Sequence, residues 1–188
     1  MLSVEAGPSR RLNEDKKGLI NVTSGEVQDG LFLEFVKFKY IDVPEDLTRY
    51  YLQKDDIILN YVNSIKKIGK CALYRGEFSP VVIGHNVLRI KINRTISDPI
   101  FITQFMKTQY FMNQIRSITK PAVNQASFNM TDLRMCKVNL PPLPLQQKFA
   151  RIVEKAEELR EKQQRQMQEA DNLFNALMQK AFTGELVE

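Results

Sequence analysis

Apolar and small side chains recur at alternating intervals of four and three residues along the last quarter of the chain. These positions are Leu145, Phe149, Ile152, Ala156, Leu159, Ala170, Leu173 and Leu177, with Gln163 and Gln166 at the two middle positions. Prolines precede this stretch, but the run from Leu145 to Thr183 contains neither Gly nor Pro. The pattern predicts one long helix with a heptad seam, which needs a partner helix. Because a helix from Pro144 to Gln179 would be about 54 Å long, we interpret it as a spacer; the alternative is an ordinary amphipathic core helix.

The first three quarters of the chain show shorter patterns that predict a mixed α+β domain. Alternating or continuous apolar runs favour strands at 19–22, 31–43, 57–59, 71–74, 87–92 and 135–140. Asp98 followed by Pro99 is typical of a helix start, and one or two helices are expected to run to about Ile118. A short turn or helix is expected at 128–133, and residues 1–17 look like an irregular lead-in. We therefore predict a globular domain at 1–143 and a helical region at 144–188.

The composition narrows the chemistry that this chain can perform. Cys71 and Cys136 have different neighbourhoods, and His85 is the sole histidine, so neither a disulfide framework nor a metal site is expected. His85 lies in a predicted turn, and the adjacent Asp55 and Asp56 suit a turn better than a metal site. The glycines do not match a phosphate-binding loop or a dinucleotide site, so no cofactor and no catalysis are expected. With no membrane-spanning run and few cysteines, the sequence favours a cytoplasmic protein.

The positive charge is concentrated in the predicted globular domain. Residues 1–143 carry twenty Lys and Arg against fourteen Asp and Glu, whereas residues from Pro144 onward carry seven against eight. An excess of this kind is compatible with a nucleic-acid partner, whose phosphates attract cations.

Two polar loops and one strand supply the candidate DNA-binding residues. Each loop mixes cations, which suit phosphates, with amide or hydroxyl groups, which suit base edges. The first loop contributes Tyr61, Asn63, Ser64, Lys66, Lys67 and Lys70, the second contributes Lys120, Asn124 and Gln125, and the predicted strand at 87–92 and its end contribute Arg89, Lys91 and Arg94.

Four segments of the sequence resemble the specificity (S) subunit of type I restriction-modification systems. They are Leu52 to Ile58 with Ile68-Gly69-Lys70, Asp98 to Phe101, Ala122 to Gln125 with Phe128-Asn129 and Leu133, and Leu140 to Gln147 with the terminal Ala181 to Leu186. The prolines before Gln146-Gln147 and the terminal Ala-Phe-Thr-Gly-Glu-Leu are the most specific of these. The chain departs from the family at Asp55-Asp56, where Gly-Asp is usual, and at Asn60.

The resemblance implies a non-catalytic subunit that reads double-stranded DNA. Residues 1–143 would be a target recognition domain for one half-site, and residues 144–188 a conserved region that spaces two such readers. Methyltransferase and restriction subunits would be its partners. Because family members usually carry two recognition domains, the resemblance implies half a subunit, which would form a homodimer or pair with a second half subunit.

Two other functions fit some of the same residues. The first is a coiled-coil adaptor that binds protein and not DNA, with Pro141 to Pro144 as a Pro-x-x-Pro ligand. The second is an enzyme whose site carries no recognisable motif.

Overall fold

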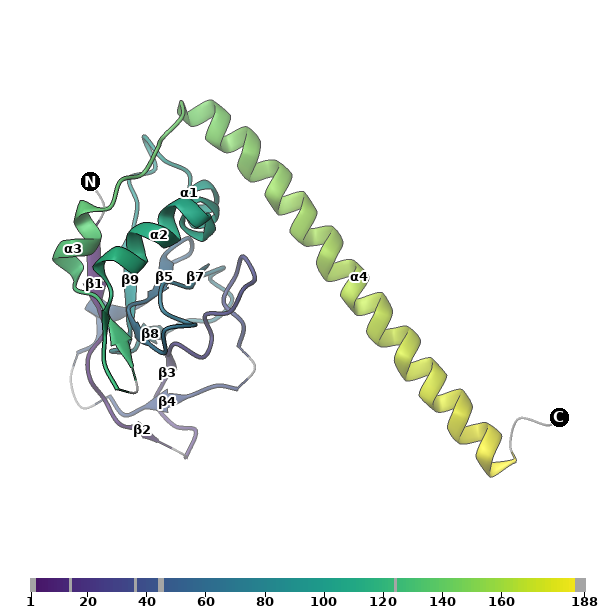
Figure 1. Cartoon of the computed structure of the whole chain (residues 1–188). Coiled ribbons are helices and arrows are strands. Elements are labelled where there is room, and N and C mark those ends of the chain that lie inside the picture. Colours follow the sequence, from purple (N-terminus) through teal and green to yellow (C-terminus); the bar gives the residue numbers. More distant parts are fainter. Residues whose placement is uncertain (1–2, 14, 36, 44–45, 124, 185–188) are drawn as a thin grey trace. The chain divides into compact units, whose positions relative to one another are not determined.

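The chain forms two compact units, Met1–Gln147 and Lys148–Glu188. The structure is a computed structural model that describes residues 3–13, 15–35, 37–43, 46–123 and 125–184. Within these described residues, the first unit contains three sheets and three short α-helices, and the second unit contains the greater part of one long helix (Figure 1).

A four-stranded antiparallel sheet forms the centre of the first unit. Its order is β1 (Ser3–Ala6), β9 (Val87–Lys91), β5 (Ile57–Asn60) and β7 (Cys71–Leu73). Every residue of β5 and β7 is buried. Residues 57–59 and 71–73 are therefore continuously apolar, without the alternating polar positions of a strand that has one solvent-exposed face. Residues 3–6 were predicted to be irregular, but they pair with β9, because a short edge strand needs only a partner with free backbone groups.

A second four-stranded sheet packs against the first through a shared apolar cluster. Its order is β2 (Leu12–Asn13), β4 (Tyr40–Ile41), β3 (Leu19–Val22) and β8 (Val81–Ile83), and β3 and β8 run parallel. Val22 and Ile83 of this sheet share a core cluster with Ile58, Ala72 and Val87 of the first sheet.

The predicted strand at 31–43 is wrong over most of its length. Among the described residues of this stretch, only Tyr40–Ile41 forms a strand, while Phe35 and Phe38 pack against each other with ring centroids 5.9 Å apart. Phe38 also meets the ring of Phe78 at 5.0 Å in an edge-to-face contact. Aromatic side chains here pack mainly against one another, so their spacing does not follow the alternation of a paired strand.

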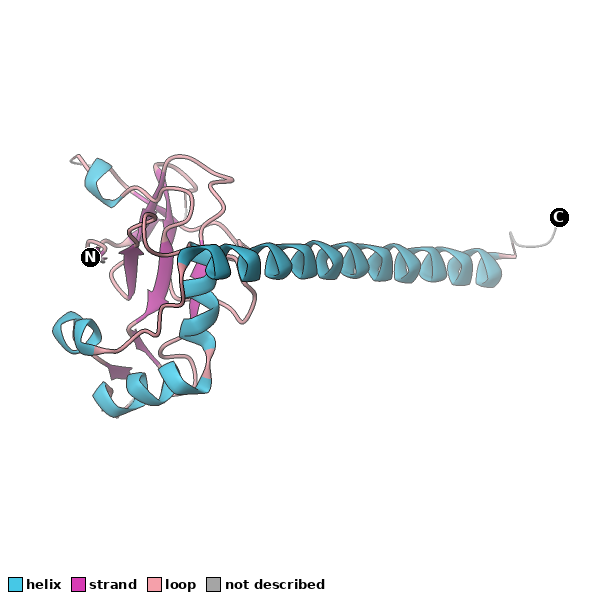
Figure 2. Ribbon diagram, turned by 90° about the horizontal axis from the view of Figure 1, so that it is seen from above, coloured by secondary structure: helices cyan, strands magenta, loops and turns pink. Residues whose placement is uncertain are grey.

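The three short helices follow from clear local signals. They are α1 (Pro99–Lys107), α2 (Gln109–Ile118) and α3 (Met130–Met135), and they lie together on one side of the strands (Figure 2). The Asp98 carboxylate caps α1 by accepting hydrogen bonds from the backbone N–H groups of Ile100 at 2.9 Å and Phe101 at 3.1 Å. Thr108 ends α1 and caps α2, so one residue divides the predicted helical stretch into two helices.

Residues 136–140 do not form the predicted last strand. After α3, the Gln114 side chain on α2 accepts a hydrogen bond from the Lys137 N–H at 2.7 Å and donates one to the Lys137 carbonyl at 3.0 Å. A side chain therefore satisfies the backbone groups that a neighbouring strand would otherwise pair.

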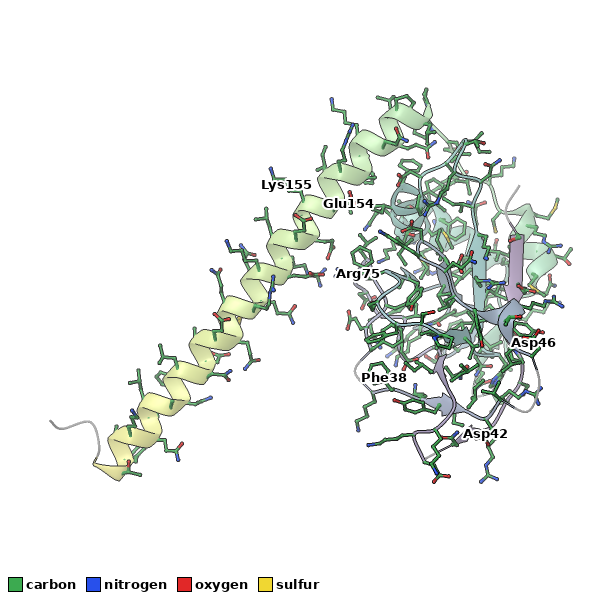
Figure 3. All side chains as sticks on the ribbon, turned by 180° about the vertical axis from the view of Figure 1, so that it is seen from behind. Phe38, Asp42, Asp46, Arg75, Glu154 and Lys155 are labelled. Carbon is green, nitrogen blue, oxygen red and sulfur yellow. The ribbon has the colours of Figure 1, made fainter. Side chains whose placement is uncertain are left out.

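The long helix predicted from the heptad pattern is present. Helix α4 spans Leu143–Thr183, and large apolar side chains along it are exposed, among them Ile152 at 62%, Leu159 at 55% and Leu173 at 62%. Figure 3 shows its side chains, among them Glu154 and Lys155, standing out from the helix along its length. Mixed sheets with short helices and one long helix confirm the predicted α+β class. Among the described residues, no helix is long and apolar enough to cross a membrane.

Candidate nucleic-acid interface

A small three-stranded sheet brings the two predicted DNA-binding loops together. Its order is β10 (Lys120–Pro121), β11 (Ala126–Ser127) and β6 (Val62–Asn63), and both pairings are antiparallel. Ala126 lies opposite both Pro121 and Asn63. The chain that leaves Asn63 and the turn that joins Pro121 to Ala126 therefore project from the same end of this sheet. We call residues 64–67 the first tip and the described residues 122, 123 and 125 the second tip.

Backbone hydrogen bonds of the buried Asn60, at the end of β5, hold the base of the loop that contains the first tip. Asn60 is fully buried, its N–H donates to the Lys70 carbonyl at 2.9 Å, and its own carbonyl accepts from the Gly69 N–H at 2.8 Å. Gly69 has a φ of 81°, and a Cβ there would lie 2.9 Å from Ile115, so only glycine fits this close approach to α2. Closing the loop in this way leaves Ser64, Ile65, Lys66 and Lys67 on the surface.

The second tip is a tight turn between β10 and β11. The N–H of Ala122 donates to the Gln125 carbonyl at 2.7 Å and closes the turn. Lys120 and Gln125 are exposed, and the side chain of Val123 is 100% exposed. The predicted site residue Asn124 lies outside the described residues.

A hollow of about 410 Å³ lies beside the three-stranded sheet. It is lined by Tyr61, Val62, Lys120, Ser127, Phe128, Asn129 and Met130. The Tyr61 hydroxyl donates a hydrogen bond to the carbonyl of His85 at 2.8 Å, and burial raises the pKa of Tyr61. Ser127 and Asn129 were not predicted as site residues. Asn129 could have been found as a helix cap before Met130, because its side chain accepts from the Asp132 N–H at 2.7 Å.

The structure moves Arg89 from the candidate surface to the interior. Strand alternation suggested a solvent-facing cation, but the residue is 6% exposed. Its guanidinium donates to the Tyr51 carbonyl at 2.6 Å and the Arg49 carbonyl at 3.0 Å, and it pairs with the carboxylate of Glu5. Strand β1 supplies Glu5, the short helix η1 (Thr48–Tyr50) supplies Arg49, and Tyr51 follows this helix, so Arg89 holds the fold together and does not face the candidate surface.

Lys91 and Arg94 lie at the opposite end of β9 from the two tips. Because Ile57 pairs with Ile90 and Asn60 pairs with Val87, the β9 residues after Ile90 lie far from the loop that follows Asn60. Lys91 donates to the Gln53 side chain at 2.9 Å, and Arg94 forms an ion pair with Asp55. These two cations therefore do not belong to the surface that the tips form.

Two other predicted features have partners within the fold. Lys70 forms an ion pair with Asp29 at 2.8 Å, and this hydrogen bond lowers the pKa of the Asp29 carboxyl. Asp56 is buried and accepts from the Gln53 N–H at 2.9 Å, and burial raises its pKa. Among the described residues, no group of three or more His, Cys, Asp and Glu side chains is placed to hold a metal ion.

Comparison with known proteins now identifies the family. Residues 7–169 match the family model of the type I restriction modification DNA specificity domain. The chain belongs to this family. The match begins just after β1 and runs through both tips into the long helix, so it covers nearly all of the first unit and part of the second.

A curated relative and two solved structures are similar to this chain, and each of them is longer than the specificity domain. A curated relative, described as a putative type I restriction enzyme MjaX specificity subunit of Methanocaldococcus jannaschii, is 29% identical over 98% of this chain and 44% of its own length. The solved HsdS subunit from Thermoanaerobacter tengcongensis has a TM-score of 0.58 at 15% identity, over 96% of this chain and 48% of that chain. A chain from a structural study of complex assembly and conformational transition in the type I R-M system has a TM-score of 0.59 at 16% identity. This similarity covers 98% of the present chain and 44% of that chain. The specificity domain thus spans about half the length of the relatives that it matches, and the two solved structures share its fold.

Proposed function

We propose that this chain is a non-catalytic DNA-reading unit of a type I restriction-modification complex, and that it reads one half-site of a bipartite target. The observation that carries this proposal is the convergence of the two tips at one end of the three-stranded sheet. Two loops separated by more than fifty residues in the sequence form a single polar, cationic surface there. Family membership supports the same function.

The tips divide the two tasks of DNA recognition between their side chains. Lys66, Lys67 and Lys120 are exposed cations and serve as phosphate contacts. Asn63, Ser64 and Gln125 offer donors and acceptors that suit base edges. Lys70 and Arg89 are not part of this surface because Asp29 and Glu5 hold them.

Helix α4 serves to pair this DNA-recognition unit with a second recognition unit. Its seam leaves side chains such as Ile152 and Leu159 more than half exposed, and a heptad seam buries such residues against a partner helix. The partner is a second copy or another recognition unit, and a two-fold dimer would read a palindromic pair of half-sites. Methyltransferase and restriction subunits then bind this paired reader and perform the chemistry.

The alternative function, a protein-binding adaptor, requires a Pro-x-x-Pro segment in an extended conformation, which residues 141–144 do not have throughout. A Pro-x-x-Pro ligand needs an extended polyproline II segment, but Leu143 and Pro144 form the first turn of α4. The carbonyl of Pro142 accepts from the Leu145 N–H at 2.9 Å, which begins the helix.

Selection of bound sequences from a random duplex pool, by this chain together with its methyltransferase partner, tests the proposed function. We expect a motif with two short defined half-sites separated by a gap of fixed length. Binding that shows no sequence preference, or no binding to duplex DNA at low salt, contradicts the proposal.

A further inference from the structure

Each tip carries one aliphatic side chain that has no place in the core. Val123 is 100% exposed in the second tip, and Ile65 is 63% exposed in the first. An apolar anchor follows the first tip directly, because Ile68, three residues after Ile65, is only 3% exposed and precedes Gly69, which lies close to α2. Ile65 is therefore not needed to hold its loop in place.

The two aliphatic side chains lie among polar and charged residues of the two tips. Ile65 lies between the polar Ser64 and the cations Lys66 and Lys67, and Val123 lies between Lys120 and Gln125. Both tips project from the same end of the three-stranded sheet. Both residues are β-branched, so their χ1 angles are restricted and little conformational entropy is lost when a partner covers them.

The edges of DNA bases present one apolar group that such side chains can recognise. In the major groove, thymine displays its C5-methyl group, and aliphatic side chains contact it, whereas the minor groove displays no methyl group. The major groove also admits a two-stranded β-ribbon, which is the form of the second tip with its strands β10 and β11.

We propose that Ile65 and Val123 each contact the C5-methyl group of a thymine in the major groove, so that each tip selects an A·T pair at a defined orientation. This inference rests on the proposed DNA-reading function. It adds to the amide and hydroxyl contacts an apolar element of specificity that no hydrogen bond provides.

Replacement of single thymines by deoxyuridine tests this inference, because the exchange removes only the methyl group. The chain with its methyltransferase partner is titrated with the selected duplex and with duplexes carrying one deoxyuridine at each thymine in turn. We expect about fourfold weaker binding at one thymine for each tip, the factor that corresponds to one buried methyl group. Other thymines should show no difference.

Alanine variants assign each thymine to its tip. Val123→Ala should bind the thymine and deoxyuridine duplexes equally at one position and keep the difference at the other, and Ile65→Ala should do the reverse. Val43→Ala is the matched control, because Val43 is 46% exposed in the first unit and follows β4 of the second four-stranded sheet, whereas both tips project from the three-stranded sheet. This control should keep both differences.

Three results overturn the inference and leave the DNA-reading function standing. The first is sequence-specific binding by the parent chain that is equally strong to every deoxyuridine duplex. The second is a selected half-site without any A·T pair. The third is increased 2-aminopurine fluorescence next to the contacted step, which indicates an aliphatic wedge between bases. Absence of sequence-specific binding instead contradicts the proposed function itself.

Discussion

Gln146 shows at the scale of one residue why a polar side chain is present at the start of the long helix. It is fully buried, and its amide donates to the carbonyls of Ile96 at 3.1 Å and Pro141 at 2.7 Å. Its side-chain oxygen accepts from the Asp98 N–H at 3.0 Å. Gln146 thereby joins the segment that begins α1 to the segment that begins α4, and its polar groups are satisfied.

Gln146→Ala should lower the free energy of unfolding by about 2 kcal/mol, because it removes three partly buried hydrogen bonds to the backbone. Gln147→Ala is the matched control, since the neighbouring Gln147 is exposed, and it should change stability by less than about 0.5 kcal/mol. Urea unfolding of both variants measures the difference. Equal stability of the two variants would contradict the role assigned to Gln146.

Glu5 makes the stability of the first unit depend on pH. Burial raises its pKa, but the hydrogen bond from Arg49 and the charges of Arg89 and Arg49 outweigh this effect and hold the pKa below its ordinary value of 4.5. A lowered pKa means that the charged form stabilises the fold above pH 4.5, and that this contribution is lost as the pH falls through the folded pKa. We expect Glu5→Gln to cost about 1 kcal/mol at pH 7 and progressively less as the pH falls below 4.5. Urea unfolding as a function of pH checks this, and a cost that does not change with pH would show that the charge of Glu5 is not its cause.

At the scale of elements, the two tips and the strands beneath them have different tasks. Strands β6, β10 and β11 contain two residues each, so they set the positions of the tips without contributing many core contacts. The rigidity of the first tip comes instead from Asn60 and Gly69, which anchor it to β5 and α2. Exposed residues of the tips can therefore be exchanged without loss of the fold.

Lys66→Ala and Lys67→Ala should weaken binding to all duplexes about equally, and each should reduce the salt slope by up to about one unit, as expected for phosphate contacts. Gln125→Ala should instead relax base preference, because an amide suits a base edge. Titrations at several salt concentrations and a repeated selection separate these effects. If Gln125→Ala selects the parent motif unchanged, Gln125 is not a base reader.

At the scale of the whole molecule, we propose that the exposed seam of α4 determines how the chain assembles. The chain spans 44–48% of the length of its relatives, and its one long helix carries one seam. If pairing along this seam fixes the distance between two readers, the helix acts as a ruler. Its length in residues then determines the gap between half-sites.

Deletion of one heptad, residues 163–169, should shorten the gap by up to about three base pairs while both half-sites stay the same. Seven residues correspond to about 10 Å of helix, and each base pair to about 3.4 Å of DNA. Deletion of residues 163–166 is the control, because four residues turn the seam out of register and should abolish paired recognition. Repeated selection reads out both variants. A heptad-deleted protein that selects the original gap would show that α4 does not measure distance.

The sequence by itself determined the elements whose signals are local. The 4-3 spacing from Leu145 to Leu177 predicted α4, and Asp98 before Pro99 predicted the start of α1, because helix geometry and capping depend on neighbours a few residues away. The short buried strand at 57–59 followed from its apolar run for the same reason. The excess of cations in residues 1–143 and the two polar loops were also visible in the sequence.

Only the tertiary structure decided which of these residues share one surface. The register Pro121–Ala126–Asn63 joins two distant loops through strands of two residues, and such short strands have no pattern to detect. Long-range packing likewise buried Arg89 against Glu5 and Tyr51, and it placed Phe35 and Phe38 in an aromatic cluster instead of a strand. These outcomes depend on contacts between residues far apart in the chain, which local periodicity does not encode.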